Sequence, residues 1–111
     1  MKIYFSFLIV FSVLHTTAQT PELLVQLGHS DRVKCLDYSK DGDYIISGGD
    51  DDVIKLWQVA NGQMVRTFQG HRGQIYDVKW AAGGIFSCSW DDRRIIKWDI
   101  LTGKILTEYK F

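Results

Sequence analysis

Residues 44–57 read YIISGGDDDVIKLW, two runs of β-branched and aromatic residues on either side of a short acidic segment. Runs of this composition favour β-strands, and consecutive glycine and aspartate residues favour a turn. The segment therefore predicts a hairpin, with one strand at Tyr44–Gly48, a turn at Asp50–Asp52 and a second strand at Val53–Gln58.

Two further strands are predicted to flank this hairpin. Val33–Tyr38 precedes it across the turn dipeptide Asp41-Gly42, and Gln63–Gln69 follows it after Asn61-Gly62. Short strands joined by tight turns pair with their neighbours, so these four strands are expected to form one antiparallel sheet.

The same order of signals recurs further along the chain. Gly28-His29 recurs as Gly70-His71, and residues 54–57 (IKLW) recur as residues 95–98 (IIKW). The second set of strands is expected at Ile75–Trp80, Ile85–Ser89, Arg94–Asp99 and Lys104–Phe111. A period of about 40 residues is that of one four-stranded blade of a β-propeller. The expected fold class is therefore all-β, with two four-stranded antiparallel blades of an incomplete propeller.

These motifs resemble the WD-repeat family of β-propeller proteins. The resemblance covers residues 23–111 and rests on four motifs: Gly28-His29, Ser47-Gly48-Gly49-x-Asp51, Ile54-Lys55-Leu56-Trp57 and the closing Trp98-Asp99. It is specific because several signatures coincide twice at one period, whereas a single Trp-Asp pair would carry little information. One departure is Gln58, which stands where the first repeat would usually end in Asp. The resemblance implies radially arranged blades whose loops bind proteins or peptides, with no catalysis and no cofactor.

The resemblance also implies that polar residues within each repeat form a structural hydrogen-bond network. The matching residues are His29, Ser47, Asp51 and Trp57 in the first repeat and His71, Asp92 and Trp98 in the second. The second repeat is one residue shorter between its histidine and its tryptophan. A single gap aligns Asp92 with Asp51 but places Cys88 opposite Ser47. Aligning Ser87 and Asp91 instead requires an extra residue before Trp98, and the first alignment is preferred.

Histidine, serine and aspartate are also the components of a catalytic triad. We interpret His29, Ser47 and Asp51 as structural, since a buried imidazole needs hydrogen-bond partners, whereas a nucleophile needs an exposed oxygen beside a pocket. The run Asp50–Asp52 lacks the alternating acid spacing and the trailing glutamate of a calcium loop. No cysteine and histidine residues have zinc-binding spacing, so no metal site is expected.

Four loop residues are candidates for contact with a partner: Arg32, Arg72, Gln74 and Trp90. The first three precede the first strand of a repeat, and Trp90 lies in the turn between the second and third strands of the second repeat. In a propeller these loops converge at one end of the blades, and exposed tryptophan and arginine are enriched in protein interfaces. The alternative is that Trp90 packs against the adjacent blade.

Residues 1–18 are predicted to be a secretory signal peptide. Lys2 supplies the positive end, residues 3–14 are almost wholly apolar, and Thr16-Thr17-Ala18 supplies a cleavage site of small residues. The apolar run is too short to span a bilayer as a helix, so no lasting membrane anchor is expected. The alternative is a buried strand, because the run contains many β-branched and aromatic residues. A signal peptide would place the protein in the periplasm or outside the cell.

Charge and cysteine content set further limits. The chain has 13 basic and 13 acidic residues, so it offers no basic field for nucleic acid. Its two cysteines, Cys35 and Cys88, fall in predicted strands of different repeats, where small buried side chains are common. A disulfide between them is therefore the less favoured alternative.

The predicted organisation is a signal peptide at residues 1–18, an N-terminal segment with an outer strand at 19–27, and repeats at 28–69 and 70–111. Closed propellers need about four blades or more, so a longer chain or self-association is expected to supply the rest. The expected function is a non-catalytic protein-interaction scaffold in an exported protein. The alternative is the propeller portion of a larger secreted or surface enzyme whose catalytic domain is absent from this sequence.

Overall fold

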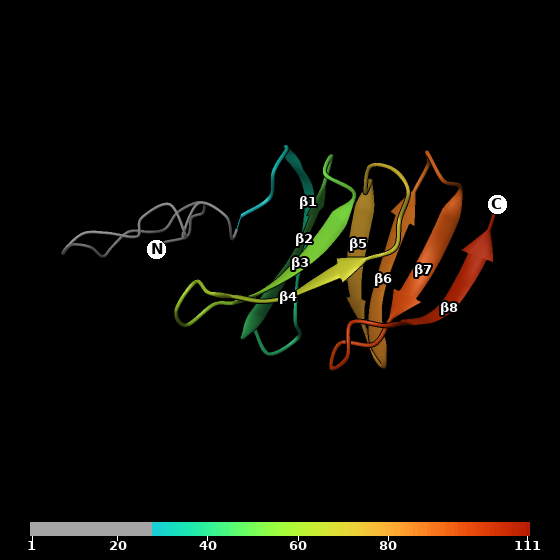
Figure 1. Cartoon of the computed structure of the whole chain (residues 1–111). Helices are drawn as coiled ribbons and strands as arrows, with labels where there is room; N and C mark the ends of the chain where they lie inside the picture. The colour runs from blue at the N-terminus through green and yellow to red at the C-terminus, as the bar shows by residue number, and fades with distance from the viewer. Residues whose placement is uncertain (1–27) are drawn as a thin grey trace.

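A computed structural model describes residues 28–111 (Figure 1). The predicted signal peptide and the predicted outer strand within residues 19–27 lie outside the described residues. The described part of the chain folds into eight β-strands without a helix. It accordingly contains no helix capable of crossing a membrane.

The strands form two four-stranded sheets, blade 1 and blade 2, in which each strand pairs antiparallel with its neighbour in sequence. Blade 1 consists of β1 (Val33–Tyr38), β2 (Tyr44–Gly49), β3 (Val53–Gln58) and β4 (Met64–Gln69). Blade 2 consists of β5 (Asp77–Ala81), β6 (Gly84–Ser89), β7 (Arg94–Trp98) and β8 (Ile105–Lys110). The predicted all-β architecture of two antiparallel blades is confirmed.

Most strand ends fall within one residue of the prediction, and the largest difference is at the start of β5. Strand β5 was expected from Ile75, but the N–H of Ile75 donates a 2.9 Å hydrogen bond to the carbonyl of Gly49 in blade 1. The chain therefore joins the first blade before it enters the second. Strand β7 ends before Asp99, because that carboxylate accepts the N–H of Leu101 at 3.0 Å and closes the next turn.

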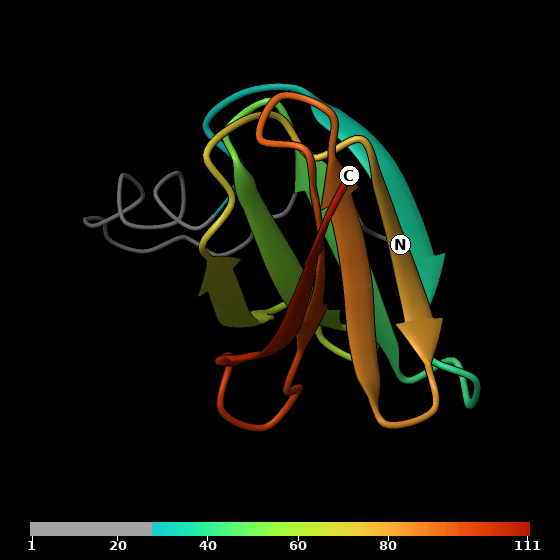
Figure 2. The same cartoon turned by 90° about the vertical axis from the view of Figure 1, so that its right-hand side faces the viewer.

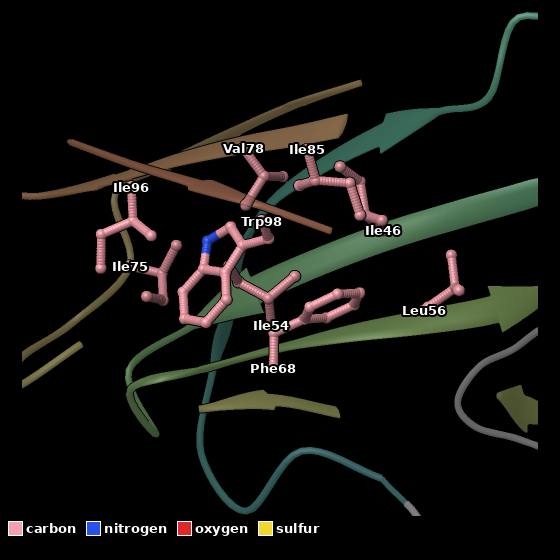
Figure 3. Packing of buried hydrophobic residues seen from close by; sticks show 9 residues of the cluster. All are labelled: Ile46, Ile54, Leu56, Phe68, Ile75, Val78, Ile85, Ile96 and Trp98. Atoms are coloured by element: carbon pink, nitrogen blue, oxygen red, sulfur yellow. The ribbon is translucent and has the colours of Figure 1, made fainter. Parts of the chain in front are cut away.

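The hydrophobic core lies between the two blades (Figure 3). Blade 1 contributes Ile46, Ile54, Leu56 and Phe68, and blade 2 contributes Ile75, Val78, Ile85, Ile96 and Trp98. All nine side chains are buried. Within the core, the ring of Trp98 meets the ring of Phe68 edge to face at a centroid distance of 5.8 Å. One face of each blade is thus covered by the other, and this burial is the main stabilising contribution.

Polar contacts fix how the blades are aligned. The N–H of Trp80 in β5 donates to the carboxylate of Asp37 in β1 at 2.7 Å, and Arg66 in β4 donates to the carbonyl of Ile100 at 2.9 Å. Figure 2 shows the result: β1 lies beside β5 at one edge of the stack, and β4 and β8 lie at the opposite edge. The β2–β3 and β6–β7 turns consequently lie at the same end of the molecule (Figure 1).

Candidate functional site

In blade 1, four polar side chains from different elements form a continuous network. His29 precedes β1, and its Nδ1 lies 2.8 Å from Oδ2 of Asp51 in the β2–β3 turn. Its Nε2 lies 2.7 Å from Oγ of Ser47 in β2, and the indole N–H of Trp57 in β3 donates to the same Oγ at 2.8 Å. The network therefore ties the loop before β1 to the β2–β3 turn.

Blade 2 contains the equivalent network. Nδ1 of His71 lies 2.8 Å from Oδ2 of Asp92, and its Nε2 lies 2.8 Å from Oγ of Ser87. The indole N–H of Trp98 donates to Ser87 at 2.8 Å. The structure thus brings His71, Asp92 and Trp98 together, as the resemblance implies, but the hydroxyl comes from Ser87. The alignment that placed Cys88 opposite Ser47 is wrong.

Two compensating changes in length explain the misalignment. In the first hairpin Tyr38 pairs with Ile45, seven residues on, whereas in the second Trp80 pairs with Ile85, only five residues on. The β6–β7 turn then gains one residue, because Asp51 follows Ser47 by four positions and Asp92 follows Ser87 by five. A single gap cannot represent a deletion of two residues followed by an insertion of one.

The partners assign the same proton positions in both networks. The indole N–H donates to the serine oxygen, the serine O–H donates to Nε2 of the imidazole, and the Nδ1–H donates to the carboxylate. Burial lowers the pKa of His29 and of His71 below the usual value, although the hydrogen bonds to Asp51 and Asp92 act in the opposite direction. Both imidazoles are therefore neutral at pH 7, and each imidazole nitrogen, serine hydroxyl and indole N–H of the two networks has a hydrogen-bond partner.

These contacts resemble a hydrolase triad in distance but differ in accessibility. The hydroxyls of Ser47 and Ser87 belong to buried residues and already accept an indole N–H. A nucleophilic serine instead presents its oxygen to a substrate. The geometry of both networks is accordingly that of a structural clamp.

A buried guanidinium extends the network in blade 2, and sequence reasoning missed it. Arg94 donates to Asp92 and to Glu108, each at 2.9 Å, and also to the carbonyl of Gly70. Burial raises the pKa of Asp92, but hydrogen bonds from the Arg72 N–H, His71 and Arg94 outweigh burial and lower this pKa to about 2. One signal was present in the sequence: in β7, Arg94 alternates with the buried Ile96 and Trp98, so it faces inward and needs a counter-ion.

The loop residues at this end form a polar row across the two blades. Arg32 donates to Asp50 at 3.0 Å, and the N–H of Gln74 donates to Asp91 at 2.9 Å. Lys34 connects the blades, since its Nζ lies 3.5 Å from Asp50 and donates to Oε1 of Gln74 at 3.1 Å. The predicted partner-binding residues Arg32 and Gln74 therefore belong to one continuous surface.

The side chain of Trp90 is exposed at the same end. Trp90 lies in the segment that gains a residue relative to blade 1, and 64% of its surface is accessible. Its ring lies 5.5 Å from the ring of Phe111, and the guanidinium of Arg93 lies 5.7 Å from its centroid. These contacts are within blade 2, in contrast to the alternative in which Trp90 packs on the adjacent blade. Sequence reasoning did not single out Arg93 or Phe111.

The remaining candidate, Arg72, is exposed and donates its backbone N–H to Asp92 at 2.9 Å, as Ser30 does to Asp51 in blade 1. Cys35 and Cys88 are free thiols. Among residues 28–111, no group of three histidine, cysteine or acidic residues has an arrangement that could hold a metal ion.

Two stacked four-stranded blades, each clamped by a histidine, serine, aspartate and tryptophan network, define a β-propeller repeat protein. The family described as "WD domain, G-beta repeat" matches residues 21–58 and 62–99, and the chain belongs to this family. The resemblance predicted from the sequence motifs is confirmed.

Several longer proteins are similar to the chain. It is 32% identical over 84 residues to WD repeat domain-containing protein 83 homolog of Dictyostelium discoideum, an alignment that covers 74% of this chain and 25% of that protein. It is 33% identical over 81 residues to eukaryotic translation initiation factor 3 subunit I of Xenopus laevis, which covers 71% of this chain and 25% of that protein. The chain thus spans about a quarter of the length of these relatives.

Proposed function

We propose that this chain supplies two blades of a propeller that binds a protein or peptide partner at the network end of the blades and catalyses no reaction. The observation that carries this proposal is Trp90, a large aromatic side chain that is 64% exposed on a turn held in place by a buried network. Such a side chain is stabilised by burial against a partner, and tryptophan is among the residues that contribute most to binding energy.

The surroundings of Trp90 support binding to a protein. Arg93 and Phe111 flank its ring and give an aromatic and cationic surface. This surface connects to the polar row through Asp91, the residue after Trp90, which accepts the N–H of Gln74. Interfaces commonly combine an apolar centre with a polar rim of this kind. The Asp92 network beneath it keeps the turn rigid, so less conformational entropy is lost on binding.

The names of relatives are consistent with a scaffold. Eukaryotic translation initiation factor 3 subunit I and Transcription initiation factor TFIID subunit 5 are named as subunits of larger assemblies. We extend to this chain only the general role of holding proteins together. Among residues 28–111, each blade buries one face against the other and has a second face that the other blade does not cover. The proposal therefore includes further blades, from a longer chain or from self-association.

The proposal also includes export, on the basis of the apolar residues 3–14 and the small residues 16–18. Expression of the full chain in a secreting host, followed by N-terminal sequencing and mass determination, tests it. A mature protein that begins near Gln19 is expected. A folded soluble protein that retains residues 1–18 would overturn the export proposal.

Binding can be tested without a known partner by selecting peptides from a random library on the full chain. Trp90→Ala should weaken the selected peptides by about tenfold or more, the loss typical of an interface anchor. Leu101→Ala is a matched control, because Leu101 is also exposed but lies in the turn at the opposite end of blade 2. Peptides that are sensitive to Leu101→Ala and insensitive to Trp90→Ala would overturn the proposed site. A turnover activity that Ser47→Ala abolishes in a folded protein would overturn the non-catalytic role.

A further inference from the structure

The face of blade 1 that packs against blade 2 can be compared with the equivalent face of blade 2, here called the open face. The comparison indicates which side chains can pack against that open face. Blade 2 covers the face of blade 1 that contains Ile54 and Phe68, which are 0% and 1% exposed. In blade 2, Ile95 pairs with Tyr109 as Ile54 pairs with Phe68 in blade 1, so the two pairs occupy equivalent positions. Ile95 and Tyr109 are 38% and 54% exposed. Figure 2 shows this face of blade 2 turned toward the viewer, with none of the eight described strands in front of it.

Two glycines in blade 1 make room for blade 2. A Cβ atom on Gly48 would lie 2.6 Å from Cγ2 of Ile75, and a Cβ atom on Gly70 would lie 2.9 Å from the indole of Trp98. Both partners are fully buried, so neither can move aside without disturbing the core. The formed interface therefore requires the absence of side chains at these two positions.

Blade 2 carries side chains at both equivalent positions. Gly48 pairs with Ile54 and Cys88 pairs with Ile95, so Cys88 takes the place of Gly48. Gly70 follows Gln69, the last residue of β4, which pairs with Val53 at the start of β3. Phe111 follows Lys110, the last residue of β8, which pairs with Arg94 at the start of β7. Phe111 therefore occupies the position in blade 2 that Gly70 occupies in blade 1.

The ring of Phe111 is also held in position. Its N–H donates to the carbonyl of Arg93 at 3.0 Å, its carbonyl accepts the Arg93 Nε–H at 3.0 Å, and its ring lies against Trp90. The space above Gly48 and the space above Gly70 allow blade 2 to pack on blade 1. The side chains of Cys88 and Phe111 consequently fill the two equivalent spaces on blade 2.

A second copy of this chain would present its Val33 and Trp57 to these filled positions. Val33 follows His29 by four residues, as Ile75 follows His71, and Trp57 has the strand register of Trp98. We infer that the open face of blade 2 is shaped for a blade of different sequence, with a small side chain where blade 2 has Ile75 and no bulky ring where it has Trp98. The inference rests on the proposed propeller. It excludes one source of the further blades, namely identical copies of this chain in which blade 1 of one copy packs on the open face of the next.

The first test introduces the side chains of blade 2 into the interface that already exists. Gly48→Cys and Gly70→Phe in the full chain should each raise the unfolding equilibrium constant by at least about tenfold, because overpacking a core is destabilising. Gly28→Phe is the matched control, since no atom of residues 28–111 lies within 4 Å of a Cβ atom at Gly28. Urea unfolding followed by tryptophan fluorescence measures the change. If the unfolding equilibrium constants of both interface variants were within about twofold of the wild-type value, the inference would be overturned.

The second test opens the filled positions. The double variant Cys88→Gly/Phe111→Gly should self-associate at least about tenfold more tightly than the wild type in sedimentation velocity, as the face then matches that of blade 1. Tyr109→Ala, which removes apolar area from the same face without opening either position, should show no gain. Equal association of the wild type and the double variant would overturn the inference. Neither readout depends on peptide binding at Trp90, so failure here leaves the proposed function intact.

Discussion

The indole N–H of Trp98 donates to the hydroxyl of Ser87 over 2.8 Å, and both residues are buried. This single contact joins the network to the hydrophobic core, because the same indole packs edge to face on Phe68 of the other blade. The serine oxygen is thus an obligatory acceptor inside the protein. Its removal leaves both the indole N–H and Nε2 of His71 without a partner.

Ser87→Ala should therefore lower the free energy of unfolding by about 1–3 kcal/mol, the usual consequence of leaving buried polar atoms unpaired. Cys88→Ala is the matched control at the adjacent position, and we expect a change of about 0.5 kcal/mol or less, since its side chain is only partly buried and lies outside the network. Urea unfolding measures both. The reverse order of effects would show that Cys88, and not Ser87, belongs to the clamp.

Stability should fall on acidification, in two steps. Burial lowers the pKa of His29 and His71, so in acid the unfolded chain binds protons near pH 6.5 that the folded chain does not, and unfolding is favoured. Each histidine contributes a slope of up to about 1.4 kcal/mol per pH unit below that value. The pKa of Asp92 is lowered to about 2, so its contribution is present above about pH 4 and is lost as the pH falls toward 2.

Urea unfolding measured between pH 8 and pH 3 tests this dependence. His29→Gln and His71→Gln should each flatten the first step, because glutamine does not titrate in this range. An increase of stability between pH 7 and pH 5 would contradict the assignment of neutral imidazoles.

Arg94→Met should destabilise the chain by about 3–5 kcal/mol, because it leaves the buried carboxylate of Asp92 without its guanidinium. Val53→Met is the matched control, since Val53 occupies the equivalent position at the start of β3 and has no ionic partner to lose. Thermal or urea unfolding measures both variants. A loss for Arg94→Met no larger than that for Val53→Met would show that the ion pair adds nothing to stability.

The two thiols should differ in reactivity. Burial raises the pKa of Cys35 to about 11, with a further increase from the nearby carboxylate of Asp77. Cys88 lies on the open face of blade 2. Burial raises its pKa as well, but Cys88 is less buried than Cys35. Iodoacetamide should therefore modify Cys88 first, while Cys35 reacts only as the chain unfolds, because the thiolate is the reactive species. Peptide mass spectrometry identifies the modified residue, and faster modification of Cys35 would contradict the blade packing.

Several features of the fold could be predicted because they depend on local sequence. Runs such as residues 53–58 have the composition of strands, and turn dipeptides such as Asn61-Gly62 separate them. The recurrence of Gly-His and of the strand tryptophan identified the blade and its family. The choice of Asp92 over Asp91 also followed from spacing, and the structure places Asp92 beside His71.

The features that were missed depend on how segments far apart in the sequence meet. Ser87 takes its place in the network because one hairpin is shorter and the next turn is longer, and only strand register separates these two changes. Arg94 reaches Glu108 because β7 pairs with β8. Phe111 meets Trp90 because the end of β8 lies beside the β6–β7 turn. None of these contacts has a periodic signal in the sequence.

The sequence by itself determined the strands, their antiparallel order and the repeat, because hydrophobic alternation and turn chemistry act between near neighbours along the chain. Only the tertiary structure decided which blade faces are filled. Gly48 and Gly70 admit Ile75 and Trp98, whereas Cys88 and Phe111 stand at the matching positions of blade 2. The physical reason is steric: whether a side chain fits depends on the atoms that another blade brings within van der Waals distance, and that distance is set by packing.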